Sequence, residues 1–133
     1  MMIDTSFAID LMRERRRRRA AEAVAFLRAN SAAKLRMPVF ALCELELGVA
    51  RSTDAARERA ALRHLTEYVE VIPPEPGFAE IYARIAAALL AAGTPIPIMD
   101  ALIAATAIQH AEPLVTRDTE HFCLVDGLTV LGY

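Results

Sequence analysis

The chain has 133 residues, of which 55% are hydrophobic, and its formal net charge at pH 7 is -2. This length predicts one domain over residues 1–133, and the slight negative charge excludes a general attraction of the whole chain to nucleic acid. The longest nearly apolar stretch, residues 85–99, is interrupted by glycine and proline and is too short to span a bilayer. The two cysteines lie far apart in no metal-binding spacing, which predicts a reduced, cytoplasmic protein.

Short apolar runs that predict buried strands alternate with segments of helical periodicity along the chain. Strands are expected at residues 1–4, 34–37, 69–72, 113–116 and 128–133. Helices are expected at residues 5–14, 17–30, 38–52, 54–68, 75–93, 99–111 and 118–122. The helix at 38–52 is apolar almost all round, which predicts that it is buried. Strands alternating with helices predict an α/β fold with a small parallel sheet and helices on both of its faces.

Four acidic residues stand out by their position relative to this sheet. Asp4 ends the first strand, Asp118 follows the strand at 113–116, and Glu44 and Asp100 lie at or near helix starts that could border the same edge. Ligands of parallel sheets bind beyond the carboxyl ends of the strands. Each acid also has a structural interpretation. Asp4 and Asp118 fit helix N-caps, Asp100 fits a first-turn acid favoured by the helix dipole, and Glu44 fits a solvated helix residue.

Carboxylates that converge on one edge repel one another, and a divalent cation relieves that repulsion. Oxygen ligands favour Mg²⁺ or Mn²⁺ over zinc, and water on such an ion can attack a phosphodiester. No histidine or cysteine stands in a zinc-binding spacing, so His64, His110 and His121 are interpreted as ordinary, partly exposed residues. The spacing of the acids alone is compatible with metal-dependent phosphoryl chemistry.

Four motifs add a resemblance that covers essentially the whole chain. MIDTS at the N-terminus, CELELGV in the third helix, PIMDALIAATA, and LVTRDTEHF near the C-terminus occur in this order. Together they resemble the PIN-domain family, most closely its VapC-type toxin ribonucleases of toxin–antitoxin pairs. The resemblance implies a three-layer α/β/α fold and Mg²⁺- or Mn²⁺-dependent cleavage of RNA by a metal-activated water. It also implies a cognate VapB-like antitoxin and a homodimer.

The same resemblance assigns roles to individual residues by their place in the motifs. Asp4 and Asp100 become the main metal ligands and catalytic acids. Glu44 and Asp118 complete the catalytic, metal-binding pocket. Thr5 and Thr116 flank the pocket, where they could hydrogen-bond a carboxylate or a metal-bound water.

The third helix offers a choice between two acids. Glu44 and Glu46 lie two residues apart and point to nearly opposite sides of a helix, so periodicity does not choose between them. The family pattern places its acid four residues before a glycine, which selects Glu44 before Gly48. Glu46 then needs another partner, such as an arginine.

An arginine run follows the first helix. Arg15, Arg16, Arg17, Arg18 and Arg19 could contact RNA phosphates as a local basic patch. The alternative, which a single-sign run favours, is a solvated helix start partly paired with nearby glutamates. A third possibility is contact with acidic parts of a partner protein.

Competing function classes leave different signatures in a sequence. A PIN-like module that uses an acidic pocket only to hold a protein partner remains the chief alternative. A haloacid-dehalogenase-type phosphatase needs a second aspartate two positions after the first, where Ser6 stands instead. A phospho-accepting receiver domain needs a lysine near the late strands, and Lys34 is the only lysine. Neither a P-loop nor a Gly-x-Ser-x-Gly turn is present.

Overall fold

The computed structural model describes residues 1–13 and 18–133, and it describes side chains for residues 1–13 and 21–133. Its strands form one parallel sheet in the order β3-β2-β1-β4-β5. They are β1 (Met2–Ile3), β2 (Arg36–Pro38), β3 (Glu70–Ile72), β4 (Leu114–Val115) and β5 (Val130–Leu131). The expected strands are therefore present, each within or close to its expected range, and the α/β class is confirmed.

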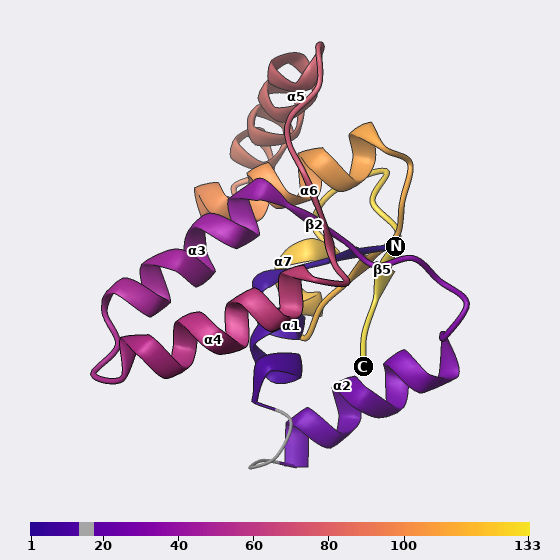
Figure 1. The fold of residues 1–133 in the computed structure, drawn as a ribbon. Coiled ribbons are helices and arrows are strands. Elements are labelled where there is room, and N and C mark those ends of the chain that lie inside the picture. Colours follow the sequence, from indigo (N-terminus) through magenta and orange to yellow (C-terminus); the bar gives the residue numbers. More distant parts are fainter. Residues whose placement is uncertain (14–17) are drawn as a thin grey trace.

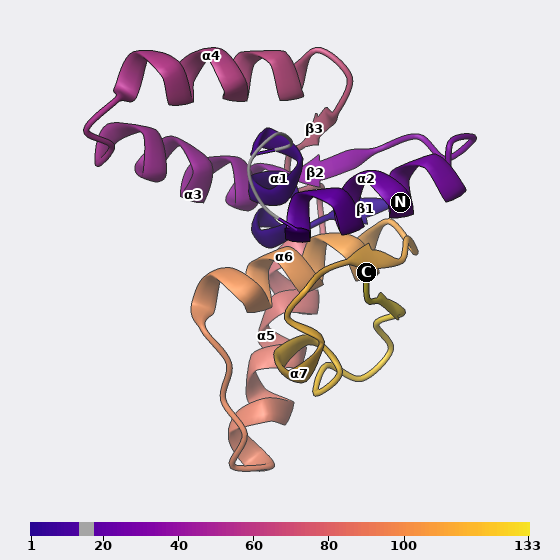
Figure 2. The same cartoon turned by 90° about the horizontal axis from the view of Figure 1, so that it is seen from below.

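Helices cover both faces of this sheet (Figures 1 and 2). They are α1 (Thr5–Met12), α2 (Arg18–Ala29), α3 (Val39–Ala50), α4 (Ala55–Thr66), α5 (Phe78–Ala91), α6 (Ile98–Gln109) and α7 (Thr119–Phe122). Figure 2 shows α1 and α2 on one side of the strands and α5, α6 and α7 on the other. These two helical layers with the sheet between them form the three-layer α/β/α arrangement. The α3–α4 hairpin extends from the edge of the layers.

Residues with restricted backbones set where the helices begin and end. Pro38 and Pro97 precede α3 and α6, with φ of -57° and -52°, close to the value that proline requires. The Asp54 carboxylate accepts a hydrogen bond from the Arg57 backbone N–H and caps α4. Gly93, expected from the sequence to end α5, lies just past its last turn with a φ of +70°.

The core lies where the central strands meet the helices on each face. The largest fully buried side chains include Met2 and Ile3 of β1, Leu114 of β4, Phe7 of α1 and Ile103 of α6. Because β1 is the middle strand, its side chains are covered on both faces, and its run of apolar residues reads continuously instead of alternating. This central strand leads directly into Asp4.

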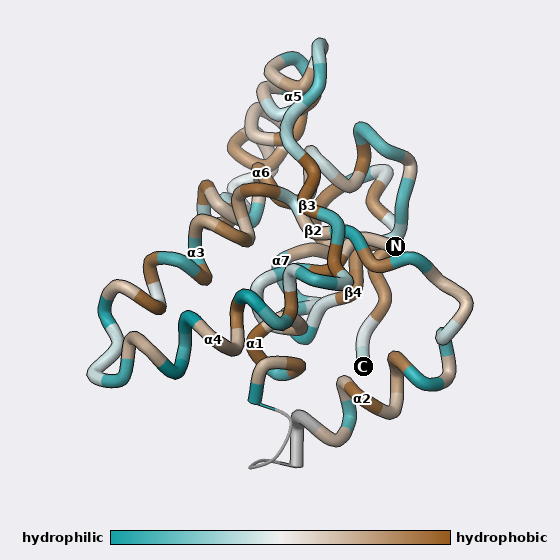
Figure 3. Tube along the Cα trace, viewed as in Figure 1, coloured by the Kyte–Doolittle hydropathy of each residue, from teal (hydrophilic) through white to brown (hydrophobic). Residues whose placement is uncertain are grey.

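One expectation about α3 is wrong, since the helix is not buried all round. Ala41, Leu45 and Val49 are buried, whereas Leu47 is 57% exposed and Cys43 is exposed as a free thiol. The physical reason is that α3 leaves the sheet as one arm of a hairpin, so that part of its surface has no neighbouring layer. Hydrophobic residues continue along this arm in Figure 3.

None of the helices within residues 1–13 and 18–133 combines the length and the hydropathy that crossing a lipid bilayer requires.

Candidate active site at the centre of the sheet

The candidate site lies where the order of the strands reverses. The chain builds β1, β2 and β3 outward in one direction and then returns to place β4 on the other side of β1. Such a switch point opens a crevice at the carboxyl ends of the two strands, between the helices that leave them. Asp4 directly follows β1 and Thr116 directly follows β4.

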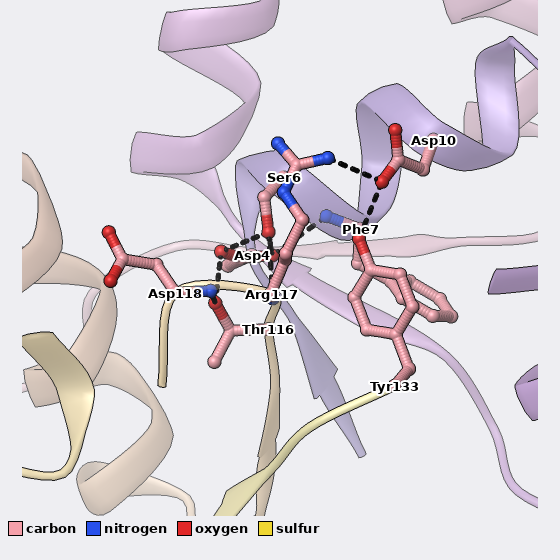
Figure 4. A network of polar contacts seen from close by, with 8 residues as sticks. All are labelled: Asp4, Ser6, Phe7, Asp10, Thr116, Arg117, Asp118 and Tyr133. Carbon is pink, nitrogen blue, oxygen red and sulfur yellow. Dashed lines mark hydrogen bonds and ion pairs between the residues drawn. The ribbon is translucent and has the colours of Figure 1, made fainter. Parts of the chain in front are cut away.

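Asp4 is held in that crevice by hydrogen bonds to both of its carboxylate oxygens (Figure 4). Its Oδ1 accepts from the backbone N–H of Phe7 at 2.9 Å, and its Oδ2 accepts from the Thr116 hydroxyl at 2.6 Å. The Ser6 Oγ lies 2.8 Å from both oxygens. Burial raises the pKa of Asp4 above its usual value, although these hydrogen bonds oppose the rise. These donors fix the orientation of the Asp4 carboxylate at the end of β1.

Asp100, Asp118 and His121 form the tightest group of potential metal ligands among the described residues. One ligand atom from each lies within 4.8 Å of the others. The His121 Nδ1 lies 2.9 Å from Asp118 Oδ2 and 3.4 Å from Asp100 Oδ2. Burial and then the negative charge of Glu44 raise the pKa of Asp100, an effect to which Asp118 adds and which His121 opposes. The carboxylates of Asp100, Glu44 and Asp118 therefore lie close enough to repel one another electrostatically.

Glu44 and Glu46 lie on different sides of α3, as their spacing predicts. The Thr5 hydroxyl donates to Glu44 Oε2 at 2.5 Å, which ties Glu44 to the residue after Asp4. Glu46 instead forms an ion pair with Arg59 of α4 at 2.5 Å, so the expectation of an arginine partner is confirmed. Glu44 faces the site and Glu46 faces the hairpin.

The four expected acids thus form one connected set, although they do not all touch. Thr116 donates to Asp4 and accepts from the backbone N–H of Asp118 at 2.9 Å, so it joins these two acids. Both structural interpretations of the capping residues also hold, because Asp4 caps α1 and Asp118 caps α7. A carboxylate at a helix N-terminus can keep further lone pairs for a ligand, so capping and metal binding are compatible.

The side chains of the arginine run, residues 15–19, lie outside the part of the chain that the structure describes. Arg15, Arg16 and Arg17 lie outside the described residues. Arg18 and Arg19 begin α2, and their side chains are likewise outside the description.

Sequence reasoning missed several residues that the structure brings to the site. His121, interpreted as ordinary, contacts two of the acids. Ser6 contacts Asp4 and also accepts from the Arg117 backbone N–H at 3.0 Å. The available signals were the Asp-Thr-Ser capping pattern for Ser6 and, for His121, its position three residues after Asp118, which places both on one side of a helical turn.

A second polar cluster stands beside Asp4, and we name Asp10, Arg117 and Tyr133 the Asp10 clamp (Figure 4). Asp10 of α1 is 6% exposed, and its Oδ2 accepts from Arg117 Nη1 at 2.7 Å and from the Tyr133 hydroxyl at 2.9 Å. Burial, the hydrogen bond to Asp10 and the charge of Asp10 raise the pKa of Tyr133. The clamp holds Arg117, which lies between Thr116 and Asp118, and Tyr133 against α1.

A groove of about 270 Å³ leads away from Glu44 between α1, α3 and the start of α4. Its walls combine apolar side chains with two glutamates, and it is lined by Ile9, Met12, Arg13, Glu44, Leu45, Gly48, Val49, Ser52 and Glu58. Glu44 lines this groove and also belongs to the acidic site.

The donor set fits a divalent cation. Carboxylate oxygens from Asp100 and Asp118, one imidazole nitrogen, and the remaining capacity of Asp4 and Glu44 supply the ligand types that Mg²⁺, Mn²⁺ and related ions accept. The raised pKa values of Asp4 and Asp100 show that buried carboxylate charge is disfavoured here without a counter-charge.

Comparisons with known proteins give a consistent result. The PIN domain family model matches residues 1–128. The chain is 32% identical over 90 residues to ribonuclease VapC4 of Mycobacterium tuberculosis (strain ATCC 25618 / H37Rv), covering 66% of this chain and 69% of that relative.

Solved structures show the same fold. VapBC2 from Rickettsia felis, bound to a DNA fragment from its promoter, aligns with a TM-score of 0.86 at 21% identity over 99% of this chain and 97% of that one. VapBC-5 from Mycobacterium tuberculosis, a member of a family of toxin–antitoxin systems, aligns with a TM-score of 0.63 at 30% identity over 74% of this chain and 79% of that one. With the model match across residues 1–128 and the acids gathered at the switch point, the chain belongs to the PIN domain family.

Proposed function

We propose that this chain is a metal-dependent ribonuclease of the VapC type, whose activity a cognate VapB-like antitoxin neutralises. The observation that carries the proposal is the group formed by Asp100, Asp118 and His121. The Thr116 hydroxyl links Asp4 to this group, and the Thr5 hydroxyl holds Glu44 beside the residue that follows Asp4. Membership of the PIN domain family and similarity to ribonuclease VapC4 support it. We infer that Asp4, Glu44, Asp100 and Asp118 are the functional acids.

The contacts of each residue indicate its role in the proposed reaction. Asp100 and Asp118 offer carboxylate oxygens to Mg²⁺ or Mn²⁺, while Asp4 contributes one further oxygen from a fixed, hydrogen-bonded position. Thr5 orients Glu44, which adds negative charge beside Asp100. A divalent cation held there acidifies a water molecule and offsets the charge that develops on an RNA phosphate.

Cleavage of RNA by the purified protein tests this function. We expect activity with Mg²⁺ or Mn²⁺ and none with chelator, and we expect product ends that carry a 5′-phosphate, because water and not the RNA 2′-hydroxyl attacks. Gel analysis of end-labelled RNA, with enzymatic identification of the ends, measures both. Full activity in chelator or 2′,3′-cyclic phosphate ends would contradict the mechanism. Absence of cleavage with either metal would favour a non-catalytic binding module.

The groove supports the antitoxin part of the proposal. Its apolar walls suit a hydrophobic segment, and because Glu44 lines it, a basic side chain of that segment, such as arginine, can meet this carboxylate. An arginine inserted there replaces the charge of metal and substrate through paired hydrogen bonds to carboxylates.

Filling the groove tests this docking site. A Cβ at Gly48 meets no atom within 4 Å, so Gly48→Leu is expected to fold and to occupy space that the antitoxin needs. We expect it to weaken binding of the antitoxin by about tenfold or more, that is, by about 1.4 kcal/mol or more. Ala50→Leu, at an exposed position of α3 outside the groove lining, is the matched control. Equal binding by the two variants in calorimetry would place the partner elsewhere.

A homodimer belongs to the same proposal. Leu90 near the end of α5 and Ile98 at the start of α6 are each 68% exposed, which leaves apolar surface on this side of the molecule available for a second copy. Light scattering of the purified chain measures this state directly.

A further inference from the structure

His121 is the one described imidazole that enters the acidic pocket. It belongs to α7, the short helix that Asp118 caps, and its side chain is 45% exposed. Its Nδ1 atom is nevertheless enclosed, and it lies against the carboxylates of Asp100 and Asp118. His64 is 72% exposed and pairs with Glu67. The Nε2 atom of His110 is enclosed as well, but it lies 3.9 Å from a single carboxylate, that of Glu75.

The distances around this nitrogen match those between ligands of one metal ion. Two ligands bonded to an octahedral cation at about 2.1 Å and at right angles lie about 3.0 Å apart. The separations of Nδ1 from Asp118 Oδ2 and Asp100 Oδ2 are 2.9 Å and 3.4 Å. An imidazole that served only as a hydrogen-bond donor would direct its N–H at one carboxylate, whereas this nitrogen lies against the carboxylates of both Asp118 and Asp100.

The local chain explains how the ring reaches this position. Asp118 accepts a hydrogen bond from the backbone N–H of His121 at 3.3 Å, which fixes the first turn of α7. The turn brings the two side chains to the same side, three residues apart, and Asp100 approaches from α6. Phe122, the residue after His121, is 1% exposed in the core. Its burial holds the backbone of α7 in place and so fixes the direction in which the His121 ring points.

We propose that His121 Nδ1 is a ligand of the divalent cation, together with Asp100 and Asp118, and that the site therefore prefers Mn²⁺ to Mg²⁺. This inference rests on the metal site of the proposed function. Mg²⁺ binds oxygen ligands almost exclusively, whereas first-row transition metals gain affinity from an imidazole. The alternative role for His121 is that of a cation, which neutralises the carboxylates of Asp100 and Asp118 only while no metal is bound.

Electron spin echo spectroscopy of the Mn²⁺-loaded protein separates these roles. A coordinated imidazole couples the electron spin of Mn²⁺ to ¹⁴N, so we expect ¹⁴N modulation in the wild type and in His64→Gln. We expect its loss in His121→Gln, which keeps a polar side chain but removes the imidazole. Mn²⁺ bound to the wild type without ¹⁴N modulation would overturn the inference, and it would leave the ribonuclease proposal intact.

Calorimetric titration gives an independent measure with the same variants. We expect His121→Gln to weaken Mn²⁺ binding by about tenfold or more, comparable with the loss of a supporting residue at other metal sites, and to change Mg²⁺ binding by less than about threefold. Equal losses for both ions, or no loss, would overturn the stated preference. Failure of the wild type to bind either ion would instead overturn the metal-dependent function itself.

Discussion

Asp100 shows how a single residue can cost the metal-free protein stability. Burial, Glu44 and Asp118 all raise its pKa, and the contact with His121 offsets this only in part. A charge that is held against its neighbours in this way lowers the stability of the native state. The feature distinguishes a site acid from a structural acid, whose replacement removes favourable contacts instead.

The sign of a stability change tests this reading of Asp100. We expect Asp100→Asn to leave the free energy of unfolding in chelator unchanged or to raise it by roughly 1 kcal/mol, since one pKa unit corresponds to about 1.4 kcal/mol. The same variant should lose RNA cleavage and most of the stabilisation that Mn²⁺ gives the wild type. Thermal unfolding with chelator and with metal measures both effects. A large loss of stability in chelator would mean that Asp100 is held in a structural ion pair.

The pH dependence of this stability follows from the same pKa. Below the usual value of 3.8, Asp100 is protonated in both the folded and the unfolded states. As the pH rises, the unfolded state releases the proton first, so the folded state loses stability until the pH passes the raised pKa. We expect wild type to lose stability relative to Asp100→Asn in metal-free buffer as the pH rises from about 4. Parallel curves for the two proteins would show that the pKa of Asp100 is not raised.

At the scale of elements, α3 carries two acids with different tasks. Glu44 accepts from Thr5 at the site, and Glu46 pairs with Arg59 in the hairpin. We expect Glu44→Gln to reduce cleavage by orders of magnitude and Glu46→Gln to preserve it, because only Glu44 acts on the pocket. The exposed Glu46–Arg59 pair is worth at most about 1 kcal/mol, so Glu46→Gln should also fold. Comparable cleavage by the two folded variants would show that the wrong side of α3 has been assigned.

Local patterns were sufficient to predict the elements but not all of their surroundings. Apolar runs and caps predicted each strand and helix, because short-range sterics and capping act within a few residues. They did not predict that Leu47 is exposed, since this depends on how far the α3–α4 hairpin extends from the sheet. The pairing of His121 with Asp100 was also out of reach, because it requires α6 and α7 to be packed together.

At the scale of the whole molecule, the Asp10 clamp joins three distant parts of the chain. Asp10 lies 107 residues from Arg117 and 123 residues from Tyr133, and both donate to the same carboxylate oxygen. The Tyr133 ring also packs edge-on against Phe7 at a centroid distance of 4.7 Å. The clamp therefore ties the first helix to the segment that carries Thr116 and Asp118.

Replacement of Asp10 tests how much the Asp10 clamp contributes to the stability of the fold. We expect Asp10→Ala to lower the free energy of unfolding by roughly 2–3 kcal/mol, because it leaves Arg117 and the Tyr133 hydroxyl without their acceptor. Tyr133→Phe, which removes one neutral donor, should cost about 1 kcal/mol. Asp126→Ala, at an exposed position, is the control. A urea titration in which Asp10→Ala and Asp126→Ala coincide would show that the clamp contributes nothing.

The span of these contacts has a consequence for synthesis of the protein. Asp4 leaves the ribosome more than 100 residues before its partner Thr116, which lies 112 positions later, and Tyr133 follows later still. Until then β1 has no β4 beside it, and Asp4 lacks the hydroxyl that holds its Oδ2. A partly translated chain thus carries Asp4, Glu44 and Asp100 before Thr116 and Asp118 are available to complete the pocket. The acidic pocket can therefore be complete only after translation has passed the last of the four motifs.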